Sequence, residues 1–188
     1  MTGDQKRLWK VLVFLLRMMV LAIPLYLVLL LSVDMAPLQE AVAGQSASVL
    51  GWMGYEVRLG GYHVSVGTPP DDFYFIINAD CTGWKSMLLY FALLFAVPGI
   101  GMKKRIAGLL LGIPAIWAGN IARVVGVVLA ERSLGIEAAL NLHDFAYRIG
   151  LVMLVIALWS LWLRLSRKND NKKGRGIFEG LGRILRRG

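Results

Sequence analysis

"IAGLLLGIPAIWAGNIARVVGVVLA", residues 106–130, is a predominantly apolar segment that contains one charged residue, Arg123. About 20 helical residues cross the ~30 Å hydrocarbon core of a bilayer, so this segment is long enough to span it. Small residues recur in it at every third or fourth position, a spacing that lets neighbouring helices approach closely: Gly108, Gly112, Ala115, Gly119, Ala122, Gly126 and Ala130. The segment therefore predicts a transmembrane helix packed inside a bundle.

Three further segments, at about 12–33, 84–101 and 146–163, have a similar apolar character. Hydrophobic residues make up 57% of the 188-residue chain and charged residues 18%, and the mean hydropathy is +0.60, beyond the usual range of soluble domains. We therefore predict an all-α polytopic membrane protein with four transmembrane helices, and treat residues 1–188 as a single membrane domain. The first span follows basic residues and lacks a small-residue cleavage site, so we expect it to remain as a signal anchor.

The basic residues indicate the orientation of these spans. They cluster at 6–10, 103–105 and 164–187, whereas segment 34–80 contains only Arg58. The positive-inside rule then places both termini, the 102–105 loop and the basic tail 164–188 in the cytoplasm, and segment 34–80 and the 131–145 loop outside. The net charge of +9 is concentrated beside the membrane, so it indicates lipid contact and no nucleic-acid partner. We expect a multi-pass protein of the cytoplasmic membrane.

The outer segment 34–80 carries a β pattern. Apolar residues alternate over 55–59 and 62–66 on either side of the Gly60–Gly61 pair, which predicts a hairpin, and "FYFII" at 73–77 predicts a third strand. We therefore expect a small extracytoplasmic β-hairpin cap between the first and second spans.

Cys81 is the single cysteine and lies where the second span is predicted to begin. It cannot form an intramolecular disulfide, and no C-x-x-C or Cys/His spacing accompanies it, so we predict no metal and no cofactor. With Asp80 or Thr82 as the N-cap, Cys81 would lie in the first helical turn, where the helix end favours the thiolate, although an ionised Asp80 would oppose this effect. Cys81 is therefore a candidate nucleophile.

Arg123 and His143 are candidate partners of this thiol. Arg123 lies about 12 Å below the outer end of its helix, where an arginine is costly and usually functional, although it could also snorkel to the surface. "NLHD" at 141–144 resembles a capping box at the start of the fourth span, with Asn141 as N-cap and Asp144 three residues later, which places His143 in the first turn. Alone, an interfacial histidine is more often a polar anchor.

Taken together, Cys81, Arg123 and His143 come from three different spans and are all predicted at the outer end of the membrane. A nucleophile, a fixed cation and a base form the minimum set for thiol acyl transfer. Cys81 would attack a peptide carbonyl, His143 would move the protons, and Arg123 would stabilise the thiolate or the tetrahedral oxyanion.

Three short segments, "CTGWKS" at 81–86, "GNIARVV" at 119–125 and "HDFAYRIG" at 143–150, resemble the archaeosortase/exosortase family of membrane cysteine transpeptidases. The resemblance covers about residues 74–155. It implies that Cys81, Arg123 and His143 are catalytic, and we assign Thr82 and Asn120, from the same segments, to substrate binding.

The resemblance also implies the substrate. It would be a secreted protein whose C-terminal signal combines a short motif, a transmembrane helix and a basic tail. The family cuts at the motif through a thioester and passes the new C-terminus to a lipid or another amine acceptor. Two departures, fewer spans than many relatives and the acidic Asp80 before the cysteine, leave the subfamily, the recognised motif and the thiol pKa open.

Two alternatives use the same residues differently. An intramembrane cysteine protease would let water replace the amine in the second step. A non-enzymatic membrane assembly factor or carrier would use Arg123 to bind an anionic lipid or solute, and would tolerate Cys81→Ala.

Overall fold

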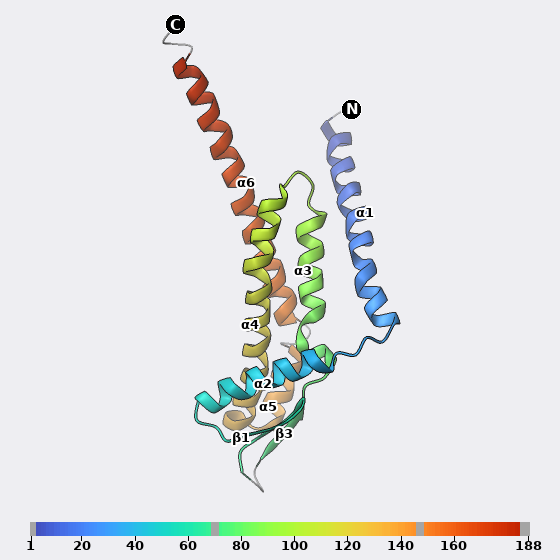
Figure 1. Ribbon diagram of the computed structural model, residues 1–188, viewed down its shortest axis with the longest axis vertical. Coiled ribbons are helices and arrows are strands. Elements are labelled where there is room, and N and C mark those ends of the chain that lie inside the picture. Colours follow the sequence, from blue (N-terminus) through green and yellow to red (C-terminus); the bar gives the residue numbers. More distant parts are fainter. Residues whose placement is uncertain (1–2, 69–71, 146–148, 185–188) are drawn as a thin grey trace.

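The computed structural model describes residues 3–68, 72–145 and 149–184 and has a helical bundle with a cap at one end (Figure 1). The bundle contains α1 (Gly3–Leu30), α3 (Trp84–Ala96), α4 (Met102–Leu134) and α6 (Leu151–Ile184). The cap contains α2 (Ala36–Trp52), α5 (Ile136–Phe145) and strands β1 (Val57–Gly60), β2 (His63–Val66) and β3 (Phe73–Ile76). The predicted helical bundle with a small β cap is thus present, and the cap also contains two helices.

Two helices of the described chain are long and apolar enough to cross a membrane, namely Arg7–Leu30 with 24 residues and Met102–Leu134 with 33 residues. The predicted spans 12–33 and 106–130 lie largely or wholly within α1 and α4. The predicted span 84–101 contains α3, which has only 13 residues. The predicted span 146–163 begins at residues outside the described ones and continues into α6. The structure thus supports two of the four predicted spans by length and composition.

The end of α3 explains why that helix is short. Pro98 and Gly99, which has a φ of +80°, follow the last helical turn and stop it. The buried Arg105 guanidinium donates hydrogen bonds to the carbonyl groups of Leu94, Val97 and Ile100 at 2.6–3.0 Å. The predicted loop at 102–105 is therefore wrong, because these residues form the first turn of α4 and one of them caps α3.

The small residues of α4 allow the close packing that the sequence predicted. A Cβ atom added at Gly112 would lie 2.1 Å from the ring of Tyr90, and one at Gly108 would lie 2.6 Å from Trp162 of α6. The Tyr90 hydroxyl donates to the Gly108 carbonyl at 3.1 Å. Gly126 is different, since nothing lies within 4 Å of its Cβ position. Close approach is therefore confined to part of the predicted stripe.

The sheet of the cap is antiparallel, in the order β1-β2-β3. Gly60 pairs with His63, and Gly61 in the turn has a φ of +63°, a conformation that glycine adopts without steric cost. The predicted hairpin and third strand are both confirmed. Because β3 ends at Ile76, the sheet leads directly to the segment that contains Cys81.

Helix α2 was not predicted and covers the inner side of the cap. Pro37 occupies its first turn, where a missing N–H costs nothing. Its buried residues Val42, Ala43, Ser46 and Leu50 follow helical spacing. Val42, Ala43 and Leu50 pack into one core with the sheet, Cys81 and the cap-side half of α4, so the sheet and α4 are held at fixed positions.

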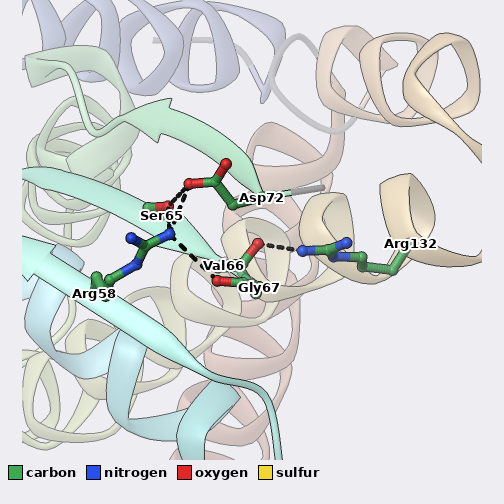
Figure 2. A network of polar contacts seen from close by, with 6 residues as sticks. All are labelled: Arg58, Ser65, Val66, Gly67, Asp72 and Arg132. Atoms are coloured by element: carbon green, nitrogen blue, oxygen red, sulfur yellow. Dashed lines mark hydrogen bonds and ion pairs between the residues drawn. The ribbon is translucent and has the colours of Figure 1, made fainter. Parts of the chain in front are cut away.

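A polar network joins the three strands to the cap end of α4 (Figure 2). Asp72, which precedes β3, accepts a hydrogen bond from the Ser65 hydroxyl at 2.7 Å and forms an ion pair with Arg58 at 2.8 Å. The hydrogen bond from Ser65 and the charge of Arg58 lower the pKa of Asp72. Arg132 of α4 donates to the backbone carbonyl of Val66. These contacts fix the start of β3 relative to α4.

Candidate active site

Cys81 lies in a short 3-10 helix, η1 (Ala79–Thr82), between β3 and α3. Asn78 is its N-cap, since its side-chain oxygen accepts a hydrogen bond from the Cys81 N–H at 2.9 Å. Gly83 then adopts a φ of +76°, which separates η1 from α3. The predicted cap at Asp80 or Thr82 and the placement of Cys81 in the first turn of the long helix are therefore wrong.

The backbone on both sides of Cys81 is held by other elements. Asn120 of α4 is fully buried, and its side-chain amide donates to the Cys81 carbonyl at 2.8 Å. A Cβ atom at Gly83 would lie 3.2 Å from Asn120, so only glycine fits closely here. Thr82 is also fully buried, and its hydroxyl donates to the Ala79 carbonyl at 2.8 Å. Asn120 and Thr82 thus contact the turn that carries the thiol.

The strand that leads to η1 is fixed in the same way. The side-chain amide of Gln39, on α2, donates to the Ile77 carbonyl at 2.7 Å. The Ile77 N–H donates to the Tyr62 carbonyl at 3.0 Å. The position of Cys81 is therefore determined by α2, the sheet and α4 together.

Cys81, Arg123 and His143 line one cavity of about 190 Å³. They come from η1, α4 and α5, so the structure brings together all three residues that the sequence predicted. The other described residues of the lining are apolar: Phe73, Phe75, Ile76, Ile77, Val124, Val127, Val128, Ile136, Ala139 and Leu140. A cavity of this size is smaller than the ~300–1,000 Å³ of drug-sized ligand pockets and has room for one or two side chains.

Several effects shift the pKa of the Cys81 thiol in opposite directions. Burial raises the pKa of the thiol above its ordinary value, and the charge of Arg123 works against that effect. Asp80 raises the thiol pKa further, but its carboxylate pairs with Lys85 at 2.6 Å. Because burial is the largest effect, the thiol is mainly protonated at neutral pH. Chemistry at this sulfur therefore requires a group that removes the proton.

His143 is carried by α5 and is partly exposed, with 39% of its side chain accessible. It lies in the last turn of this helix, and Asn141 lies within the helix, so the predicted capping box and first-turn position are wrong. The predicted 131–145 loop is also wrong, because α4 continues to Leu134 and α5 begins at Ile136. The Nδ1 atom of His143 lies 3.7 Å from a carboxylate oxygen of Asp144.

A sequence signal for α5 was available. Ile136, Ala139, Leu140 and His143 follow the spacing of one helical face, and all four line the cavity.

Within residues 3–68, 72–145 and 149–184, no cluster of three His, Cys, Asp or Glu side chains is placed to hold a metal ion.

A comparison with protein families gives a match over most of the chain. The model of a family described as transmembrane exosortase (Exosortase_EpsH) matches residues 4–163 of the chain. The matched region contains the whole cap and all three polar residues of the cavity. No curated protein and no solved structure matches the chain.

Proposed function

The chain belongs to the transmembrane exosortase family, and on that premise we propose that it is a membrane cysteine transpeptidase with Cys81, Arg123 and His143 as its catalytic residues. One observation carries the proposal: these three side chains line a single, otherwise apolar cavity. A low-dielectric cavity strengthens the interaction of a fixed cation with a developing negative charge.

The first half-reaction forms a thioester. His143 takes the proton from the Cys81 thiol as the sulfur attacks the carbonyl carbon of the scissile peptide bond. Arg123 stabilises the negative charge that develops, on the sulfur before attack and on the carbonyl oxygen after it. The tetrahedral intermediate then collapses, the C–N bond breaks, and the proton held by His143 passes to the leaving amine. The N-terminal part of the substrate remains attached to the sulfur.

The second half-reaction releases the N-terminal part of the substrate from the sulfur. An amine acceptor, which we propose to be a membrane lipid or another small amine, attacks the thioester, and His143 takes a proton from it. The C–S bond breaks, Cys81 regains its proton, and the substrate carries a new amide at its C-terminus. Water in place of the amine would make the same residues a protease.

Asn120 and Thr82 have a supporting role in this proposal. Both are fully buried and contact the backbone of η1. They therefore position the turn of Cys81 for attack and do not touch the substrate, so their role is indirect.

We propose that α1, α3, α4 and α6 all cross the membrane, with both termini inside and the cap outside. The side-by-side arrangement of these helices supports this, as does the placement of the start of α1 and of the α3–α4 turn at the end away from the cap (Figure 1). The catalytic cavity then faces the extracytoplasmic side. A secreted protein with a C-terminal motif, transmembrane helix and basic tail would present its motif there.

The test is co-expression with candidate substrates, followed by mass spectrometry of the processed C-terminus. Cys81→Ala, Arg123→Ala and His143→Ala should each abolish processing. His63→Ala is the matched control, because His63 lies on β2 beside Tyr74 and not in the cavity. It should process normally.

The outcomes separate the candidate functions. An amine-linked group on the new C-terminus supports transfer, whereas a free carboxylate identifies a protease. If Cys81→Ala retains function while Arg123→Ala abolishes it, the protein is an assembly factor or carrier and the enzymatic proposal is wrong.

A further inference from the structure

A second cavity, larger than the first, lies at the end of the bundle opposite the cap. It has a volume of about 450 Å³. Residues of α1, of the α3–α4 turn and of α6 line it: Val11, Phe14, Val97, Pro98, Gly99, Trp159, Leu163 and Arg167. We propose that this cavity binds one anionic phospholipid. We call it the lower groove because it lies at the end of the bundle that we propose to face the cytoplasm, the end drawn at the top of Figure 1. The proposal goes beyond the function at Cys81 and does not depend on the chemistry there.

The lower groove exists because α1 is only partly integrated into the bundle. This helix packs against α3, and Figure 1 shows it standing apart from α6. Much of its surface is exposed and apolar, as at Leu12, Leu15 and Leu16. In a membrane protein this surface faces acyl chains, so the space between α1 and α6 is accessible to a lipid from the side.

Arg167 gives the lower groove its charge. It is the one charged residue among those described in the lining, and it is exposed. Two buried or partly buried cations nearby are already used: Lys104 donates to the Ser166 carbonyl at 2.7 Å, and Arg105 caps α3. In contrast, within the part of the chain that the structure describes, the Arg167 guanidinium makes no hydrogen bond or ion pair. A ligand with a phosphate group would satisfy it.

The apolar wall and the single cation of the lower groove favour one class of ligand over the others. The transmembrane helix of a substrate with a basic tail would bring positive charge toward Arg167, which is unfavourable. A free phosphate would leave the apolar wall in contact with water. An anionic phospholipid satisfies both parts, since its acyl chain covers Phe14 and Leu163 while its phosphate binds the guanidinium.

The experiment uses the full-length protein in nanodiscs with a photoreactive phosphatidylglycerol that carries a diazirine in its acyl chain. A phosphatidylcholine analogue with the same chain is the neutral probe. Crosslinked residues are mapped by mass spectrometry. We expect phosphatidylglycerol to label the groove residues Val11, Phe14, Trp159 and Leu163 about fivefold more than phosphatidylcholine does, the factor expected for one basic residue near the membrane surface.

Two matched variants test the role of the cation. Arg167→Gln should remove the preference for phosphatidylglycerol, whereas Arg164→Gln should keep it, because Arg164 is an exposed arginine one turn earlier on α6 that does not line the groove. Both residues are exposed, so neither change should affect folding. Equal labelling by the two lipids, equal loss of preference in both variants, or labelling spread evenly to the outward-facing Leu110 and Leu111 of α4 would overturn the proposal.

Discussion

The Cys81 thiol is buried, and its pKa is raised by that burial although Arg123 lies nearby. This combination keeps the sulfur mainly protonated at neutral pH. In the proposed mechanism, a substrate that enters the cavity would exclude water further and bring a carbonyl group for Arg123 to polarise, so the thiolate would be required only at the moment of attack.

The pH dependence of alkylation tests this arrangement. Because the thiol pKa is raised, the rate of reaction with iodoacetamide should continue to increase with pH beyond about 8.5, the ordinary value for a thiol. Arg123→Gln should move the inflection to higher pH, and Asp80→Asn should move it to lower pH. Since Cys81 is the single cysteine, the signal is unambiguous. An inflection at or below that of a small free thiol would contradict the account.

Asn120 should act through the position of Cys81. In Asn120→Ala the buried Cys81 carbonyl loses its donor, which should cost about 1–3 kcal/mol of unfolding free energy. Turnover should fall by more than tenfold with little change in KM, because the nucleophile and not the substrate site is disturbed. Asn141→Ala, an exposed change on α5, is the control and should leave both quantities unchanged. A change in KM alone would indicate direct substrate contact instead.

At the scale of the elements, α4 organises the molecule. In the half away from the cap, its glycines allow Tyr90 and Trp162 to pack closely against it. In the half near the cap, Asn120 and Arg123 reach the site of Cys81. One helix therefore links bundle packing to the position of the nucleophile.

Two glycine variants of α4 separate packing from helix propensity. Gly112→Ala would place a Cβ atom 2.1 Å from the buried Tyr90 ring, so it should destabilise the protein by about 1–3 kcal/mol. Gly126→Ala meets nothing within 4 Å and should be neutral or stabilising by up to about 1 kcal/mol. Thermal unfolding in detergent measures both. Equal effects of the two changes would show that α4 does not pack on α3 in this way.

The success of sequence prediction differed among the elements for physical reasons. The apolar segment 106–130 and the alternating strands have strong periodic signals, and both were found. Helix α2 was missed because its buried face uses small or polar residues such as Ala43 and Ser46, which give no apolar stripe. Helix α5 was read as a loop because Asn141 and Asp144 resemble a cap when considered without the helical face that ends at His143.

The site was predicted in part. Topology alone indicated that Cys81, Arg123 and His143 share the outer end of the protein, and they line one cavity. The local geometry could not be predicted, because the 3-10 turn depends on Asn78, Gly83 and the distant Asn120 acting together. Arg105 was likewise read as a topology signal, although its donors are used by α3.

At the scale of the whole molecule, the cap and the α3–α4 turn lie at opposite ends of the bundle (Figure 1). Pro98 and Gly99 of that turn line the lower groove. The account therefore predicts opposite sides of the membrane for the cap and the lower groove. In a Cys81→Ala background, Trp52→Cys, at the exposed end of α2, should react with a membrane-impermeant thiol reagent in intact cells. Met102→Cys, at the exposed start of α4, should react only after permeabilisation. Labelling of both from the same side would rule out the proposed topology.

Thioester formation at Cys81 is measured most directly by the mass of the Cys81-containing peptide after rapid quenching of the protein with its substrate. The account predicts a covalent adduct on this peptide with the mass of the N-terminal substrate fragment, cleavable by hydroxylamine as a thioester is, and absent in Cys81→Ala. Processing that continues in Cys81→Ala, or that proceeds in the wild-type protein with the adduct on another residue, would contradict it.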